Sequence, residues 1–267
     1  MKNFLFTLIA WGLLIAPSIA QTATTLKLVP KPKWKASSLN FGLGVDWDKF
    51  ESMSLERILV FAKNPERMQR DLQHLSEEAT PVTAGVALYA SISFSPLNYT
   101  TGNYSDNQEL QLGIGIHSPK EAMVTYKNED LDTSIVYCNI HGELTAEAAY
   151  VFKGRWGKRF HWYAGGGVNT GLTFANEMVI ISGRYFEPGA HPTTQESYEM
   201  NQDHYKAKPV YYTRAYIPYG IHYHVGKKMS IGFDFRTGLG LQMIKGASTN
   251  LITNTGSFIL GVKCYLK

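Results

Sequence analysis

One segment near the C-terminus, residues 229–241, constrains the fold of this chain more than any other. Along MSIGFDFRTGLGL, apolar side chains occupy every odd position except Thr237, and glycine, serine or charged residues occupy the even positions. This period of two indicates a β-strand with one apolar and one polar face, because an α-helix would spread the same charges around its whole surface. The segment also reaches the roughly 9–11 residues that a strand needs to cross a lipid bilayer.

Seven other segments alternate in the same way. The eight predicted strands are 39–47, 83–95, 109–117, 133–152, 160–174, 210–225, 229–241 and 257–267. Some of the connections are short or moderate (98–107, 153–158, 226–228), and the others are mostly longer (48–82, 118–132, 176–208, 244–255). Short turns at one rim and long loops at the other are typical of bacterial outer-membrane barrels. We therefore expect an all-β fold, an eight-stranded antiparallel up-and-down transmembrane β-barrel.

The first long loop has a different pattern. Ser54 can cap a helix that begins at Leu55, and Asn64-Pro65 supplies a cap and a first-turn proline for a second helix. We therefore predict a helical segment within residues 52–79, either as a structured loop or as a lid across the mouth of the barrel.

The N-terminus has the features of a secretory signal. Lys2 gives a charged start, residues 4–15 are apolar, and Ser18-Ile19-Ala20 is a small-residue cleavage site. We expect a signal peptide over 1–20, a flexible lead over 21–38 and the barrel domain over 39–267. The net charge of +4 is modest and gives no reason to expect nucleic acid as a partner.

The two cysteines both fall on apolar strand faces. Cys138 lies in the strand 133–152, and Cys264 lies in the strand 257–267. A disulfide is conceivable after export, but the pattern favours two unpaired thiols that are buried or face lipid.

Alternation alone does not say which face of the barrel points inward. A soluble lipocalin-like barrel would bury the apolar face and expose the polar one. Glycine, however, crowds the polar face, as expected for the narrow interior of an eight-stranded barrel. These glycines are Gly42, Gly44, Gly113, Gly115, Gly165, Gly167, Gly171, Gly232, Gly238, Gly240 and Gly261. The apolar face ends in aromatic residues such as Tyr150, Trp162, Tyr211 and Tyr223, as an interfacial girdle does. Both features favour an apolar exterior.

In these patterns the chain resembles the small outer-membrane β-barrel proteins of Gram-negative bacteria, the OmpA/OmpX-like and PorT-like group. The resemblance covers most of the chain after the signal and rests on the strand pattern rather than on a diagnostic motif. The closing GVKCYLK looks like the C-terminal strand that the outer-membrane insertion machinery recognises, although it ends in Lys267 where the usual pattern has an aromatic residue. The resemblance implies an outer-membrane location, with membrane lipid and the assembly machinery as partners and no cofactor.

An apolar exterior would place many charged residues in the lumen. The predicted lumenal polar network is Glu109, His141, Glu143, Glu147, Arg214, His222, Asp234, Arg236 and Lys263. Buried charges must be paired and hydrogen-bonded, so we expect these residues to form a salt-bridge plug that closes the barrel. The alternative interpretation is a narrow gated pore or a site for a small ligand.

An enzyme is the rival class of function. Some barrels of similar outline are lipid A deacylases or acyltransferases that use serine and histidine at the extracellular rim. His117-Ser118 is the nearest match here, but no acidic partner can be assigned to it. In the loop 176–208, His191, Glu196, Asp203 and His204 have spacings that match no metal-ligand pattern. We therefore predict no catalytic residue and no metal, and a structural, adhesion or partner-binding role through the long loops. The partner would be an extracellular or envelope protein.

Overall fold

The computed structural model describes residues 34–98, 103, 105–128, 133–186, 197–247 and 250–266. The predicted signal peptide and most of the predicted lead lie outside these residues. The strands are β1 (Trp34–Phe50), β2 (Ser76–Thr80), β3 (Val82–Pro96), β4 (Gln108–Lys127), β5 (Thr133–Trp156), β6 (Phe160–Phe186), β7 (Ser197–Lys206), β8 (Val210–His224), β9 (Met229–Ile244) and β10 (Leu251–Tyr265). Strand β1 thus begins five residues before the predicted start, so residues 34–38 of the predicted lead belong to the barrel wall.

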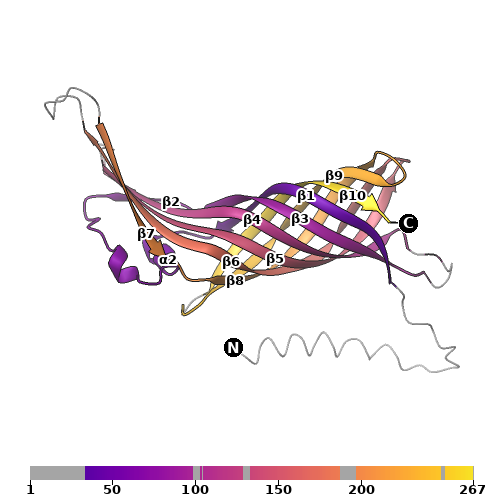
Figure 1. The fold of residues 1–267 in the computed structure, drawn as a ribbon, viewed down its shortest axis with the longest axis horizontal. Helices are drawn as coiled ribbons and strands as arrows, with labels where there is room; N and C mark the ends of the chain where they lie inside the picture. Colours follow the sequence, from indigo (N-terminus) through magenta and orange to yellow (C-terminus); the bar gives the residue numbers. More distant parts are fainter. Residues whose placement is uncertain are drawn as a thin grey trace. The chain divides into compact units, whose positions relative to one another are not determined.

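Eight of these strands close into a barrel (Figure 1). Each pairs in antiparallel fashion with its neighbours in the order β1-β3-β4-β5-β6-β8-β9-β10. Strand β10 pairs with β1, for example through Leu260 opposite Leu43, and this pairing completes the ring. The prediction of an eight-stranded antiparallel up-and-down barrel of the outer-membrane type is confirmed.

Two of the predicted long loops are wrong, because most of their residues form strands. Strand β4 continues to Lys127 and β5 begins at Thr133, so the predicted loop 118–132 shrinks to a short connection. Strand β6 continues to Phe186 and returns as β7, which replaces most of the predicted loop 176–208. Two register shifts break the period-two pattern, one in β4 between His117 and Lys120 and one in β6 between Phe174 and Glu177, which pair with Gly142 and Ile140 of β5. In β4 and in β6 the alternation resumes beyond the bulge with its parity changed, which hid the continuation of these two strands.

These continuations form a second structural feature, which we call the extended sheet. It consists of residues 118–127 of β4, 133–142 of β5 and 176–186 of β6, flanked by β2 on one edge and β7 on the other. In Figure 1 the extended sheet lies at the end of the barrel opposite the C-terminus. The long connections therefore gather at one rim as an ordered sheet.

The predicted helical segment is present as α2 (Leu55–Leu59) and a 3-10 helix, η1 (Pro65–Met68). Ser54 caps α2, because its Oγ accepts a hydrogen bond from the backbone N–H of Arg57 at 3.4 Å. No helix among the described residues has the length and apolar character needed to span a membrane.

The helical segment forms a cap over the barrel mouth. Its buried side chains, among them Ile58, Phe61 and Met68, share one apolar cluster with residues from most strands around that rim. The strand residues in this cluster are Phe50, Ala122, Val124, Tyr126, Tyr137, Met178, Ile180, Val210, Ile244 and Leu251. Because these residues come from seven strands, residues 53–68 lie across the mouth, as the lid interpretation predicted. We call this segment the cap.

The barrel wall is apolar outside and polar inside. Leu43, Ile114 and Leu239 are between 53% and 62% exposed although each lies in the middle of a strand. Exposed aromatic residues mark both ends of this belt, including Trp156 and Trp162 at the short-turn rim and Trp47 and Tyr211 near the cap. A continuous apolar surface of this kind is not stable in water and matches the lipid-facing band of a membrane barrel.

The glycines of the inner face relieve steric crowding between neighbouring strands. A Cβ atom on Gly238 would collide with the carbonyl oxygen of Ala215 and would lie 2.7 Å from the Cα of Tyr216. The room that these glycines leave is filled by long side chains from other strands. Glycine on the inner face therefore makes space for the charge network described next.

Candidate functional site

The lumen contains three layers of charged side chains. The layer beneath the cap joins three carboxylates, Asp46, Asp48 and Glu143, to the two cations Lys120 and Arg214. The Lys120 Nζ lies 3.0 Å from Asp48 Oδ2 and 3.1 Å from Glu143 Oε2, and it also contacts Asp46. The Arg214 Nη2 lies 2.7 Å from Asp48 Oδ2 and 2.8 Å from Glu143 Oε1. All five residues are at most 5% exposed, so every carboxylate in this layer is buried against a cation.

Two histidines complete this layer. His117 Nδ1 lies 2.9 Å from Asp46 Oδ2, and His141 Nε2 lies 3.7 Å from Glu143 Oε1. The other ring nitrogen of His141 is 2.9 Å from the Oδ1 of Asn139. The layer therefore consists of interlocked polar contacts among residues of β1, β4, β5 and β8.

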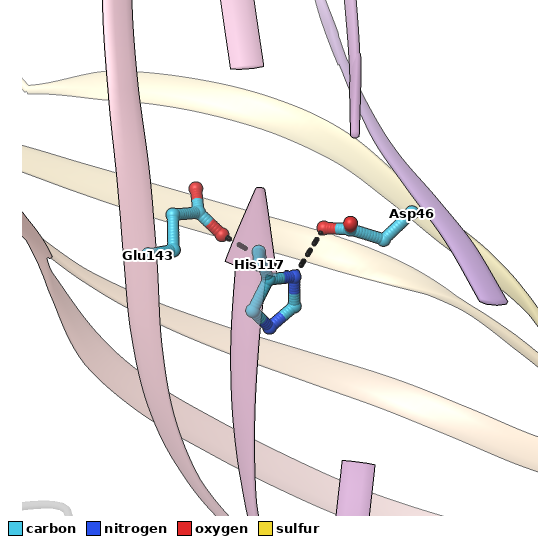
Figure 2. Close-up of side chains that lie close together, drawn as sticks. All are labelled: Asp46, His117 and Glu143. Atoms are coloured by element: carbon cyan, nitrogen blue, oxygen red, sulfur yellow. Dashed lines mark ion pairs between the residues drawn. The ribbon is translucent and has the colours of Figure 1, made fainter. Parts of the chain in front are cut away.

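Among the described residues, Asp46, His117 and Glu143 form a group with metal-ligand chemistry (Figure 2). One ligand atom from each lies within 4.8 Å of the others. The ammonium of Lys120, however, contacts the same Asp46 and Glu143 carboxylates. A divalent ion at this position would meet the positive charge of Lys120 at close range. The negative charge of Asp46 and Glu143 is therefore compensated by the ammonium group of Lys120.

The middle layer is a single ion pair across the lumen. The guanidinium of Arg236 on β9 binds the carboxylate of Glu147 on β5 through two nitrogens, one of them at 3.0 Å. The same guanidinium lies over the rings of Tyr89 and Tyr216, at 4.4 Å and 5.2 Å from their centroids. Bidentate pairing and stacking on aromatic rings both favour arginine here over lysine.

The third layer lies toward the short-turn rim. Asp234 accepts a hydrogen bond from the hydroxyl of Tyr163 at 2.6 Å and lies 2.6 Å from Nε2 of His222. Glu109 binds two ammonium groups, those of Lys153 at 2.7 Å and Lys263 at 2.6 Å. The carboxylates named here are therefore paired with cations or a histidine in all three layers.

All nine residues of the predicted network lie within these layers and take part in their contacts. Four further residues with charged side chains belong to these layers but were not predicted from the sequence: Asp46, Asp48, Lys120 and Lys153. Asp46 lies on the polar face of the predicted strand 39–47 but was not included in the predicted network, and Asp48 follows the end of that strand. Lys120 fell in a predicted loop and Lys153 in a predicted turn, so strand parity could not assign them to the lumen.

The residues considered for catalysis are not brought together. His117 is buried in the lumen, whereas Ser118 is exposed and its Oγ accepts a hydrogen bond from the backbone N–H of Val86 at 2.8 Å. The two residues are neighbours in β4, and their side chains lie on opposite faces of the strand. The pair therefore lacks the contact between nucleophile and base that a hydrolase requires.

The residues of the predicted loop 176–208 do not form a ligand set either. Asp203 and His204 are neighbours in β7, and each makes a separate ion pair. Asp203 pairs with Arg70 at 2.6 Å, and His204 pairs with Glu177 at 2.8 Å. His191 and Glu196 lie outside the described residues. Cys138 and Cys264 are unpaired, as the sequence favoured.

Comparisons with known proteins give likenesses to solved structures alone. Neither protein-family models nor characterised protein sequences give a match. Among solved structures, the chain is similar to the outer membrane protein OprG from Pseudomonas aeruginosa, with 13% identity, a TM-score of 0.41, and coverage of 87% of this chain and 97% of that chain. It is also similar to Neisserial surface protein A, with 10% identity, a TM-score of 0.33, and coverage of 88% and 99%. The attachment invasion locus protein Ail of Yersinia pestis gives 10% identity, a TM-score of 0.32, and coverage of 86% and 97%.

With TM-scores of 0.41 or less, these likenesses carry no argument about the role of the lumen or of the extended sheet.

Proposed function

We propose that this chain is an integral barrel of the bacterial outer membrane that does not conduct solutes and that uses its extended sheet to bind a partner outside the cell. The observation that supports this proposal is the double closure of the lumen. Ion pairs cross the barrel in three layers, and the cap covers the mouth above them.

The ion pairs make the lumen costly to open. A permeating solute would have to separate buried charges such as Arg214 and Glu143 or Arg236 and Glu147. Removing one partner from a buried pair costs about 3–5 kcal/mol, because the other charge is left uncompensated. The cap adds a second barrier, since Ile58, Phe61 and Met68 are at most 1% exposed.

The extended sheet has the properties of a surface that meets water and other proteins. Its ion pairs are exposed, including Lys127 with Glu78 at 2.9 Å, in which the ammonium lowers the pKa of the carboxyl. Along β7, the side chains from Glu199 to His204 are exposed. An ordered polar sheet held above the membrane by continuous strands suits recognition of an extracellular or envelope protein.

Planar-bilayer recording with the purified protein tests the closure. We expect insertion without steady channels for the wild type. We also expect that removal of the cap alone, by replacing residues 53–68 with a Gly-Ser linker, leaves conductance low because the ion pairs remain. Steady ohmic channels in the wild type would contradict the proposal.

Photo-crosslinking on intact cells tests the role of the extended sheet. A crosslinking amino acid at Glu199 should trap a discrete protein partner. The same amino acid at Leu239, in the apolar belt, is the matched control and should trap none. An absence of any product from Glu199, or identical products from both positions, would argue against a binding role for this surface.

A further inference from the structure

We propose that the mouth at the short-turn rim binds a small anion that carries a phosphate group. We call this mouth the vestibule. It is lined by four cationic side chains and two histidines: Lys35, Lys153, Arg155, Lys227, His161 and His224. This inference rests on the proposed function only for the orientation of the barrel in the membrane, in which the vestibule faces the periplasm.

The vestibule is a blind cavity. It has about 350 Å³ of open space, within the roughly 300–1,000 Å³ that is usual for small-molecule sites. Its inner wall continues into a second space of about 60 Å³, which shares Lys153, His161 and Tyr265 with it. The ion pair between Arg236 and Glu147 lines this second space. A solute that enters from the rim therefore meets a closed end.

Positive charge exceeds negative charge in the vestibule. The four cations of its wall face two carboxylates, Asp106 and Glu109. Lys263, behind the wall, shares Glu109 with Lys153. Even with Lys35 left out of the count, the described residues give four cations (Lys153, Arg155, Lys227 and Lys263) against two carboxylates, an excess of two positive charges. Glu109 is already paired with two ammonium groups, so its negative charge is compensated before an anion enters.

Arg155 is available to an incoming anion. Its nearest carboxylate is Asp106, at 3.3 Å, and the two side chains are 63% and 77% exposed. An exposed pair of this kind contributes at most about 1 kcal/mol. A phosphate group, which accepts the guanidinium through two oxygens, competes well with such a contact.

The histidines supply further donors. The rings of His161 and His224 meet edge to face, with their centroids 4.1 Å apart. Within the part of the chain that the structure describes, neither ring makes a side-chain hydrogen bond. Their ring N–H groups can therefore donate to an anion in the vestibule.

The arrangement of the donors favours phosphate over a planar carboxylate. Lys35 comes from β1, Arg155 from β5, His161 from β6, and Lys227 from the turn between β8 and β9. Donors that surround a cavity from four parts of the wall suit an anion whose oxygens point in several directions. Either a soluble phosphate compound or the headgroup of a phospholipid at the rim would present this chemistry.

Calorimetric titration of the full chain in an uncharged detergent, with inorganic pyrophosphate as the probe, tests the site. We expect saturable binding at one site that weakens as salt is raised, because the contacts are partly exposed. The double variant Arg155→Gln/Lys227→Gln should weaken binding at least about tenfold, the loss expected for two charge-assisted contacts. Both positions are exposed, and migration of the unboiled protein on a gel checks that the variant is folded.

The matched control is Lys49→Gln/Lys245→Gln, which removes the same charge near the opposite rim, where both residues are exposed. It should bind pyrophosphate as the wild type does. No saturable binding by the wild type, or an equal loss in the control, would overturn the proposal. The measurement is made in detergent, so a conducting barrel would refute the proposed function without touching this result.

Competition identifies the source of the phosphate. If short-chain phosphatidylglycerol displaces pyrophosphate more effectively than inorganic phosphate does, the natural ligand is a lipid headgroup. If inorganic phosphate displaces it and phosphatidylglycerol does not, the ligand is a soluble anion.

Discussion

At the scale of single residues, Lys120 is the most informative position. Its ammonium contacts Asp46, Asp48 and Glu143 while the side chain is completely buried. Lys120→Met keeps the length of the side chain but leaves three buried carboxylates with one fewer cation. We expect the free energy of unfolding to fall by about 3–5 kcal/mol, measured by urea unfolding in detergent micelles.

Lys127→Met is the control for this prediction. Lys127 pairs with Glu78 on the surface of the extended sheet, where the side chains are 40% and 70% exposed, so the loss should be at most about 1 kcal/mol. Chelation provides a second check. If EDTA destabilised the wild type, Asp46, His117 and Glu143 would hold a metal ion and the role given to Lys120 would be wrong.

Lys120 also shows how far residue-level prediction can go. Strand parity placed Glu147, Asp234 and Arg236 in the lumen, because an unbroken period of two fixes the face of each residue. A bulge shifts that period by an amount that cannot be read without the partner strand. Lys120 lies directly after such a bulge, so its place among the carboxylates depends on the pairing of β4 with β5.

At the scale of elements, the sequence predicted the helical turns of the cap but left their position open between a structured loop and a lid across the mouth. Ser54 and Asn64-Pro65 predicted two helical turns, and both are present. Their position over the mouth depends on contacts with distant residues such as Tyr137, whose hydroxyl donates to the carbonyl oxygen of Met68 at 3.0 Å. Long-range contacts of this kind leave no periodic signal in the sequence.

Phe61 anchors the cap, so Phe61→Ala should loosen it. The ring is 1% exposed within the apolar cluster, and its removal should cost about 3–5 kcal/mol through lost contacts and a cavity. Limited trypsin digestion of the folded protein is the measurement, because Arg57, Lys63 and Arg67 lie in the cap. We expect cleavage there to be faster by about a hundredfold or more, since local opening becomes easier.

The exposed residue Glu66 provides the matched control. Glu66→Ala should leave the rate of cleavage in the cap unchanged. Equal protection of wild type and Phe61→Ala would show that the apolar cluster does not hold the cap in place.

At the scale of the barrel, the central claim is that its apolar face meets lipid. Leu239 and Met200 are exposed to a similar extent, 60% and 54%, but Leu239 lies in the apolar belt and Met200 lies in β7. Comparing them therefore distinguishes contact with lipid from exposure alone. Leu239→Arg should destabilise the inserted barrel by about 2–4 kcal/mol, the cost of arginine near the middle of a bilayer. Met200→Arg should leave stability in lipid vesicles, measured by urea unfolding, nearly unchanged. Equal effects would mean that the belt does not contact lipid.

Gel migration of the membrane fraction before and after boiling tests the whole account most directly. A closed barrel in which every strand is paired resists SDS at room temperature. We predict that the protein is recovered with the outer membrane and runs as a faster, compact band until it is boiled. A single band from the soluble fraction, unshifted by boiling, would contradict the account, because the apolar face would then have to be buried inside a water-soluble barrel.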